Sequence, residues 1–182
     1  MKTFISILRG INVSGQRRIL MTDLKVLYES LGFKEVVTYI QSGNVIFKTG
    51  EDASNEELAK KIEQAITEKY EFEVPVIIRC VVEIEQVISV NPFLKNRGIN
   101  TEKLHVTFLA TNPTPATLQN MCAFSFPPDE FVIIGTEVFL HVPGSYGETK
   151  LSTNFFESKL KVSATTRNWK TVNKLLELAR SK

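Results

Sequence analysis

Short apolar runs alternate along the chain with segments whose apolar residues recur every three or four positions, a pattern that predicts strands and helices in turn. Ser42-Gly43-Asn44 is typical of a hairpin turn, and Ser54 to Glu57 form a capping box at a helix start. The predicted elements of residues 1–80 are a strand at 4–8, a helix at 24–31, a hairpin of 36–40 with 45–47, a helix from 54, and a strand at 74–79. Their order is β-α-β-β-α-β.

The order then recurs after a predicted connecting helix at 83–90. The elements of the second part are a strand at 104–110, a helix at 115–122, a hairpin of 131–134 with 138–142, and helices at 153–161 and 167–179. The two hairpins also read alike, with Tyr39–Phe47 beside Ile133–Leu140. The pattern predicts an internal duplication and an α+β fold of two similar β-α-β-β-α, ferredoxin-like units, with mixed or antiparallel sheets and packed helices.

A polar stretch at 96–103 lies where the repeat places the boundary between the two halves. We therefore expect a first half at 1–95 and a second half at 96–182, which carries an extra C-terminal helix, with the two halves sharing a core. A loop of this length is also typical of a flap over a site, and the sequence leaves both interpretations open.

Composition narrows the class of protein. An apolar fraction of 43% with 23% charged residues is typical of a globular chain, and 182 residues suffice to bury a core without a disulfide or a metal. The net charge of +2 is too small to indicate nucleic-acid binding by itself. Cys80 and Cys122 belong to no metal-binding or disulfide motif and are predicted to be free, buried thiols. The sequence shows no signal peptide and no membrane-spanning run, so we expect a cytoplasmic protein without membrane contact.

The segment Gly10–Gly15 has the GxxxxG spacing of a phosphate-binding loop and lies between a predicted strand and a predicted helix. Gln16 and Arg17 stand where such a loop requires Lys and then Ser or Thr, which excludes nucleotide hydrolysis by this motif. Backbone N–H groups beside Arg9, Arg17 and Arg18 remain suited to hold an anion. The alternative is a solvated basic turn in which the glycines only permit positive φ angles.

The segment Thr165–Trp169 precedes a helix whose buried apolar stripe begins at Trp169. On this interpretation a threonine caps the helix, and Arg167 lies in its first turn, where the macrodipole disfavours a cation unless a carboxylate or an anion is near. Arg167 is therefore either a ligand for an anion or a single exposed charge. A second glycine-bearing loop, 144–152, adds Lys150 to the candidates, while its Ser152 is more simply interpreted as a helix cap.

Other enzyme chemistries lack support in the sequence. His105 and His141 have no metal-ligand spacing, and no GxSxG, HExxH or dinucleotide-binding GxGxxG motif occurs. We predict no metal and no cofactor, assign no catalytic residue, and leave open whether the protein is an enzyme.

Four separated motifs together resemble a bacterial family, domain of unknown function 1697, over nearly the whole chain. The motifs are Leu8–Val13, Tyr39–Val45, Lys150–Ser152 and Thr165–Trp169. The family usually carries a glycine where this chain has Ser14 and an asparagine where it has Lys170, and the first change weakens the case for an anion site made of backbone alone. The resemblance implies an α/β fold with two similar halves and no specific activity.

The leading functional hypothesis is a binding or catalytic pocket for a small anionic or phosphate-bearing metabolite. Its candidate ligand-binding residues are Arg9, Asn12, Ser42, Asn44, Lys150, Arg167 and Asn168. The alternatives are an RNA- or DNA-binding module built on the β-α-β-β-α-β sheet, and a protein-interaction module that dimerises through a sheet edge. The pocket hypothesis further predicts that the Arg9–Gly15 loop and the Thr165–Trp169 segment meet in space.

Overall fold

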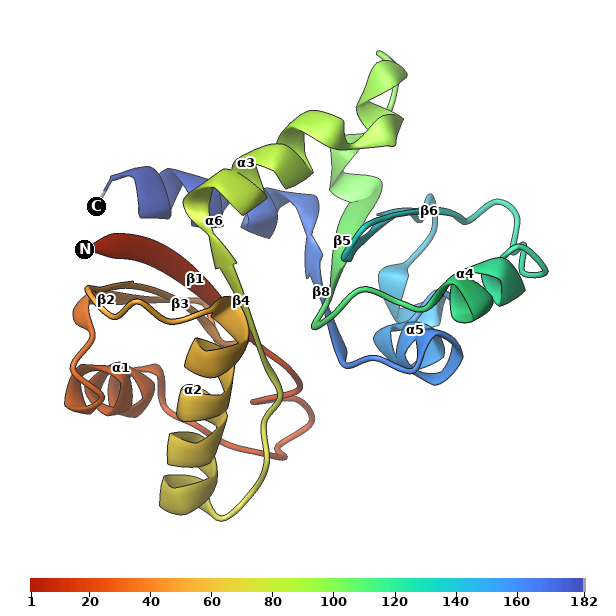
Figure 1. Cartoon of the computed structure of the whole chain (residues 1–182). Coiled ribbons are helices and arrows are strands. Elements are labelled where there is room, and N and C mark those ends of the chain that lie inside the picture. The colour runs from red at the N-terminus through yellow and green to blue at the C-terminus, as the bar shows by residue number, and fades with distance from the viewer. Residues whose placement is uncertain (182) are drawn as a thin grey trace. The chain divides into compact units, whose positions relative to one another are not determined.

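A computed structural model describes residues 1–181 and contains two compact units. The first unit comprises Met1–Gln86 together with the chain from Lys174 onward, and the second comprises Val87–Asn173. Each unit is built on a four-stranded sheet in which all neighbouring strands run antiparallel (Figure 1).

The first unit follows the β-α-β-β-α-β order that the sequence predicts. Its elements are β1 (Lys2–Leu8), α1 (Met21–Ser30), β2 (Lys34–Tyr39), β3 (Asn44–Thr49), α2 (Asn55–Tyr70) and β4 (Val76–Cys80), with α3 (Val81–Val90) directly after β4. The strands lie in the order β2-β3-β1-β4, and α1 and α2 lie on one face of the sheet (Figure 1). The predicted capping box is confirmed, because the Ser54 hydroxyl and the Glu57 carboxylate each accept the backbone N–H of the other residue.

The core of the first unit lies between this sheet and its two helices, where alternate residues of the strands present one apolar face. The rings of Phe33 and Phe47 lie 4.4 Å apart between centroids, and Tyr28 of α1 packs edge-on against Phe47. The Tyr28 hydroxyl and the Ser6 hydroxyl hydrogen-bond at 2.6 Å, so both buried polar groups have a partner. Burial raises the pKa of Tyr28 and keeps its hydroxyl protonated.

The second unit repeats the element order of the first. Its elements are β5 (Leu104–Leu109), α4 (Pro115–Met121), β6 (Glu130–Ile134), β7 (Glu137–His141), α5 (Thr153–Leu160) and β8 (Ala164–Asn168), followed by α6 (Trp169–Arg180). Short 3₁₀ helices lie in its loops at η1 (Pro92–Lys95), η2 (Thr101–Lys103) and η3 (Tyr146–Glu148). The strands lie in the order β6-β7-β5-β8, and Phe156 and Leu160 of α5 are buried in the core of this unit.

Matching hydrogen bonds support the internal duplication. The N–H of Leu8, at the end of β1, donates to the carbonyl of Gly43 at 2.8 Å, and the N–H of Leu109, at the end of β5, donates to the carbonyl of Thr136 at 2.8 Å. In each unit the next residue donates to the carbonyl that precedes the last strand. Since strand order and these closing bonds agree, the predicted α+β fold of two similar units is confirmed.

The last strand of the second unit differs from the prediction. The sequence pattern places Thr165 to Asn168 at the cap and first turn of the C-terminal helix, and this prediction is wrong. These residues pair with β5, with Val106 opposite Arg167, and α6 begins at Trp169. β8 is polar and rich in threonine, so it lacks the apolar run by which a buried strand is recognised, and only its pairing with β5 reveals it.

The polar stretch 96–103 forms local turns. The side chains of Asn96 and Asn100 accept the backbone N–H groups of Gly98 and Glu102, each at 3.0 Å. Whether this stretch acts as a linker or a flap, and whether the two halves share a core, stay predictions. Among the helices of residues 1–181, none is long and apolar enough to cross a membrane.

Candidate functional site

Asn12 closes the loop between β1 and α1, which carries the first motif. Its side-chain amide donates to the carbonyls of Ile19 and Gln41, both at 2.9 Å, and its Oδ1 accepts the N–H of Ile19 at 2.9 Å. Both amide hydrogens and the amide oxygen of Asn12 therefore bind protein groups. Asn12 joins the loop to the β2–β3 turn, a role that nothing in the local sequence pattern indicates.

The second motif packs directly on the first at Gly43. A Cβ atom at this position would lie 2.6 Å from Cδ1 of Ile11. The next residue, Asn44, is fully buried and donates to the carbonyl of Tyr39 at 3.0 Å and to the hydroxyl of Ser42 at 3.1 Å. The first two motifs, with the candidates Arg9, Asn12, Ser42 and Asn44, therefore meet within the first unit.

Backbone strain is present in the loop between β1 and α1 and in the β2–β3 turn. Asn12, Ser14 and Arg17 have φ angles of 56°, 51° and 46°, and Ile40 in the β2–β3 turn has a φ of 50°. A β-branched residue such as Ile40 is rarely found in the left-handed region. Each non-glycine residue held there costs about 1–3 kcal/mol, and such strain is most often retained at functional sites.

A pocket of about 570 Å³ opens beside the strained loop. It is lined by Asn12, Gly15, Arg18, Ile19, Leu20, Asp23, Gln41 and Tyr70. Leu20 is the N-cap residue of α1 and provides no side-chain cap, so the first N–H groups of this helix have no hydrogen-bond partner within residues 1–181. Arg18 is exposed and forms no ion pair or hydrogen bond with any described residue. We call this cavity the loop pocket.

Tyr70, at the C-terminal end of α2, supplies a further polar group to the loop pocket. Its hydroxyl oxygen is buried and has no hydrogen-bond partner among the described residues. Burial raises the pKa of Tyr70, and the negative charge of Asp23 raises it further, so the hydroxyl remains a donor at neutral pH. Lys69 Nζ lies 5.3 Å from the Tyr70 ring centroid and adds positive charge nearby. A buried donor without an acceptor is destabilising unless a ligand or water satisfies it.

Arg167 lies in the second unit and is buried in β8, not in a helix. Its Nη1 donates to the Thr165 hydroxyl and to the carbonyl of Thr166, both at 2.9 Å. Burial lowers the pKa of Arg167 to about 10. Arg79 has the equivalent place in β4, and its Nη1 donates likewise to the carbonyl of the preceding residue, Ile78. The expectation that Arg167 sits unfavourably in a first helical turn is therefore wrong, because the residue lies in a strand. Its proposed role in ligand binding stays a prediction.

Asn168 and Lys150 are the other candidates in the second unit. The Asn168 side chain accepts the N–H of Thr171 at 2.8 Å and caps the start of α6, where the sequence pattern suggests a threonine. Ser152 caps α5 as its simpler interpretation predicts, accepting the N–H of Phe155. Lys150 is exposed, and its Nζ lies 5.7 Å from the centroid of the Phe126 ring.

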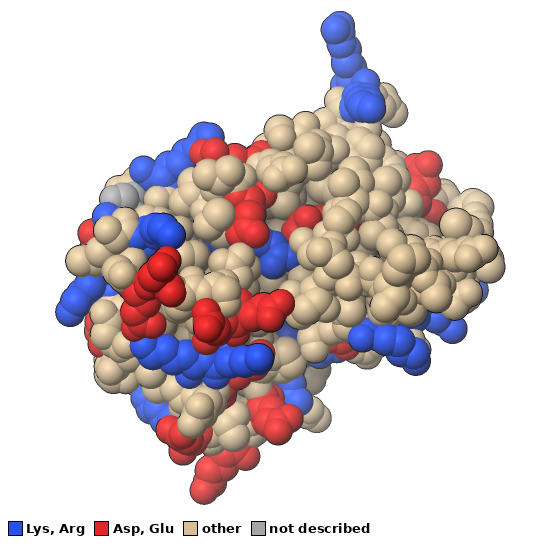
Figure 2. All heavy atoms as spheres, in the orientation of Figure 1, with Lys and Arg blue, Asp and Glu red and all other residues tan. Residues whose placement is uncertain are grey.

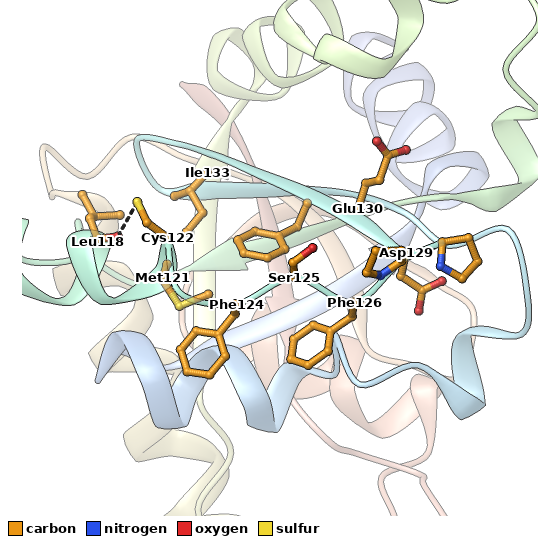
Figure 3. Close-up of a pocket in the computed structure, with 12 residues that line it drawn as sticks. Leu118, Met121, Cys122, Phe124, Ser125, Phe126, Asp129, Glu130 and Ile133 are labelled. Carbon is orange, nitrogen blue, oxygen red and sulfur yellow. Dashed lines mark hydrogen bonds between the residues drawn. The ribbon is translucent and has the colours of Figure 1, made fainter.

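Phe126 belongs to the wall of a second cavity, of about 850 Å³, which we call the β6 pocket (Figure 3). Its walls come from α4, the segment between α4 and β6, and β6 itself. The lining residues are Leu118, Met121, Cys122, Phe124, Ser125, Phe126, Pro127, Pro128, Asp129, Glu130, Phe131 and Ile133. Sequence reasoning missed this cavity because its residues read as ordinary helix, turn and hairpin positions. Cys122 is exposed here, whereas the sequence predicts a buried thiol; Cys80 is half-buried, and both cysteines are free thiols.

His105 and Tyr146 form a stacked pair at 4.4 Å between ring centroids. Nδ1 of His105 and the hydroxyl of Tyr146 are both buried without a hydrogen-bond partner in the described chain. Burial lowers the pKa of His105, and the positive charge of Lys103 adds to this effect. The pair lacks the carboxylate or thiolate companions of a metal site, and the described part of the chain holds no cluster of His, Cys, Asp and Glu suited to a metal ion.

Residues 1–139 match the family described as "Protein of unknown function (DUF1697)". The chain belongs to this family. The DUF1697 match covers the first two motifs, the loop pocket and the residues that line the β6 pocket. The chain also resembles the solved structure of the conserved bacterial protein SP0830 from Streptococcus pneumoniae, with a TM-score of 0.72, 20% sequence identity and coverage of 98% of each chain. That likeness is one of fold. No curated protein matches the chain.

The seven candidate residues thus divide between the units. Arg9, Asn12, Ser42 and Asn44 belong to the first unit, and Lys150, Arg167 and Asn168 belong to the second. The expectation that the Arg9–Gly15 loop and the Thr165–Trp169 segment meet stays a prediction.

Proposed function

We propose that the loop pocket binds a small anionic metabolite through a phosphate or carboxylate group. The observation that carries the proposal is that Arg18, the uncapped start of α1 and Tyr70, whose hydroxyl is buried without a partner, all contribute to the lining of one cavity. All three are hydrogen-bond donors without an acceptor within residues 1–181. Donors of this kind, with the positive end of a helix dipole, are suited to an anion.

Asp23 limits the class of anion that fits. Its carboxylate lies in the first turn of α1 and lines the same pocket, where it stabilises the empty helix start. A bare anion beside this carboxylate meets repulsion, whereas a ligand that carries a hydroxyl or an ammonium group next to its anionic group can bind both Arg18 and Asp23. The pocket therefore favours a phosphorylated or carboxylated metabolite with such a donor.

The lining of the loop pocket supports binding more than covalent catalysis. Its eight residues include no serine, cysteine or histidine, so the common pairing of a hydroxyl or thiol nucleophile with a histidine base is absent from the cavity. Asn12 lines the pocket, and three hydrogen bonds to the protein backbone hold its side chain in place. The strained backbone of the loop is then the cost of holding Arg18 and the helix start in place before the ligand arrives.

Ligand-dependent stabilisation tests the proposal, with inorganic phosphate and O-phosphoserine as the probes. We expect O-phosphoserine to raise the melting temperature more than phosphate does. Arg18→Gln is expected to raise the Kd at least about tenfold, because a charge-assisted hydrogen bond is worth about 1.5–3 kcal/mol. Tyr70→Phe removes one donor and is expected to weaken binding less.

Arg17→Gln is the matched control, since Arg17 belongs to the same loop and does not line the pocket. It is expected to leave the Kd of O-phosphoserine nearly unchanged. If Arg17→Gln and Arg18→Gln weaken binding equally, the interaction is a general attraction to the basic loop, and the proposed pocket is wrong. A steep fall of affinity with salt, together with tighter binding of an RNA oligonucleotide, would instead indicate a nucleic-acid surface.

A further inference from the structure

β6 forms an edge of the sheet in the second unit. It pairs with β7 on one side, and apart from this pairing its backbone forms no hydrogen bond within residues 1–181. β6 carries one charged residue, Glu130 at its start, whose carboxylate lies 3.1 Å from Nδ1 of His141. The segment Phe131–Ile134 that follows contains no charged residue, no proline and no bulge. Natural edge strands are usually protected by at least one of these devices, because an unprotected edge pairs with other strands.

The equivalent edge strand of the first unit, β2, shows how this fold protects such an edge. β2 begins with Lys34 and Glu35, and its pairing with β3 is interrupted by a register shift between Lys34 and Val37. The Glu35 carboxylate forms an ion pair with Lys48 at 2.7 Å. α1 packs directly against β2. The two units share one topology, so the weaker protection of the β6 edge, where only Glu130 is charged and no register shift occurs, is a property of its own sequence rather than of the fold.

The helix that corresponds to α1 does not close over β6, of which Phe131 and Ile133 pack only partly buried against the core. α4 packs against α5, and the β6 pocket of about 850 Å³ lies between α4 and β6. Phe131 and Ile133 face this pocket, while Val132 and Ile134 point to the other face and are 37% and 40% exposed. The surface over α4 and β6 is largely uncharged on the face drawn in Figure 2.

The aromatic wall of the β6 pocket is preformed. Phe124 and Phe126 pack edge-on against Phe155 at 5.3 and 5.5 Å between centroids, and Lys159 and Lys150 lie over their rings at 4.9 and 5.7 Å. These contacts hold the segment before β6 against α5, as Figure 3 shows for the two phenylalanines. A rigid apolar wall lowers the entropy that a partner loses on binding.

We propose that β6 and its pocket form a docking groove for an extended peptide of another protein, which adds a strand to the edge of the sheet. Alternate side chains of an added strand point to the pocket face, so large apolar residues at every second position fit the cavity. Asp129 precedes β6, Glu130 begins it, and both line the pocket. Oδ2 of Asp129 accepts a hydrogen bond from the Thr149 hydroxyl and Oε2 of Glu130 pairs with His141, while the second oxygen of each carboxylate has no partner among the described residues. The partner strand therefore carries a basic residue near this end.

A second copy of this chain fits the groove less well. Antiparallel pairing of two β6 strands about Val132 places Glu130 opposite Ile134, and the residues beyond Ile134 are Gly135, Thr136 and Glu137. No basic residue then faces Asp129 and Glu130. The charge pattern of the edge therefore favours a basic, apolar strand from a different protein.

Fluorescence anisotropy tests the proposal with three synthetic nine-residue peptides. The first peptide alternates leucine with lysine, and the second alternates leucine with glutamate. The third is the lysine peptide in which the backbone amides that would pair with β6 are N-methylated. We expect the lysine peptide to bind at least about tenfold more tightly than the glutamate peptide, and N-methylation to cost at least about tenfold because it removes the backbone pairing. Glu130→Gln is expected to reduce the ratio between the affinities of the lysine peptide and the glutamate peptide.

Ile134→Lys introduces the charge that natural edges carry and is expected to weaken binding at least about tenfold. Val26→Lys is its matched control, because Val26 is an exposed apolar residue on α1 in the first unit. Hydrogen exchange is measured on the unaltered protein, so its result does not depend on whether a variant folds. The amides of β6 are expected to exchange more slowly when the lysine peptide is present.

Equal binding of the N-methylated peptide, or unchanged exchange in β6, would overturn the proposal. A dimer of the peptide-free protein that Ile134→Lys dissociates, seen by light scattering, would also overturn it and assign the edge to a second copy. These outcomes are independent of the loop pocket, because Ile134→Lys alters no residue that lines it.

Discussion

Gly43 has a φ of 81° and lies against the side chains of Ile11 and Leu8. A Cβ atom there would lie 2.6 Å from Cδ1 of Ile11, whose side chain can move, and 2.9 Å from Cβ of Leu8, which is fixed to a buried strand. Asn12 and Asn44 act at the same junction through hydrogen bonds to backbone carbonyls. At the residue scale, therefore, the two motifs of the first unit hold each other in place.

Gly43→Ala is expected to destabilise the protein by about 3 kcal/mol, which combines about 1–2 kcal/mol for a left-handed alanine with about 1–3 kcal/mol for overpacking. Gly135→Ala is the matched change in the second hairpin, because Gly135 has a φ of 59° and a Cβ atom added to it would have no neighbouring atom within 4 Å. It is expected to cost only the backbone strain, about 1–2 kcal/mol. Urea unfolding followed by circular dichroism measures both. Equal losses would show that the close approach to Leu8 is relieved without cost.

At the scale of elements, the helix starts divide into two kinds. α2 has a full capping box, α5 is capped by Ser152, and α6 is capped by Asn168. α1 begins after Leu20, which is 66% exposed and provides no cap. Exposure of an apolar side chain at a position where Ser, Asp or Asn is preferred is a local disadvantage. The proposed anion site explains why α1 lacks a side-chain cap, because such a cap would occupy the backbone N–H groups that a ligand needs.

Leu20→Asp is expected to stabilise the ligand-free protein by about 1 kcal/mol, since its carboxylate caps α1 and complements the helix dipole. The same change is expected to abolish stabilisation by O-phosphoserine, because the new charge occupies the site. Thermal melts with and without the probe measure both effects. Leu94→Asp, at an exposed leucine in the second unit, is the control and is expected to do neither. A Leu20→Asp protein that is stabilised and still binds the probe would contradict the assignment of the helix start.

At the scale of the whole molecule, stability also depends on groups that line neither pocket. The folded protein holds His105 stacked on Tyr146, where burial lowers the pKa of the imidazole. The unfolded chain takes up a proton on this side chain near pH 6.5, whereas the folded protein takes it up only at lower pH. Between these two pKa values the unfolded state binds more protons, so the free energy of unfolding rises with pH. The contribution of His105 is therefore present above about pH 6.5 and is lost as the pH falls through the folded pKa.

His105→Phe keeps an aromatic ring on Tyr146 and removes the titration. We expect the unaltered protein to lose more unfolding free energy than this variant between pH 7.5 and pH 5. His141→Gln removes the other histidine and is expected to retain the pH dependence of the unfolding free energy that His105 causes. Urea midpoints across this range give the comparison, and parallel pH profiles for the unaltered protein and His105→Phe would show that His105 does not couple folding to protons.

The sequence by itself determined the elements, their order and the duplication. Apolar periodicity and the capping box at Ser54 are set by residues within a few positions of one another, so they can be read without knowledge of the fold. The exception is β8, which carries polar and β-branched residues and becomes a strand only through pairing with β5. The first-turn prediction for Arg167 failed for the same reason, since it assumed a helix where long-range pairing forms a strand.

The tertiary structure decided which residues are available to a ligand. Three polar motif residues are candidates for ligand binding by sequence, but their side chains hydrogen-bond the protein's own backbone: Asn12, Asn44 and Asn168. The loop pocket instead joins Arg18 to Tyr70, which lies at the far end of another helix, and the β6 pocket follows from the packing of α4 against α5. Each cavity lies where elements that are distant in the sequence do not pack closely against each other. A local pattern specifies what an element is, but the space left between elements is set only when all of them pack.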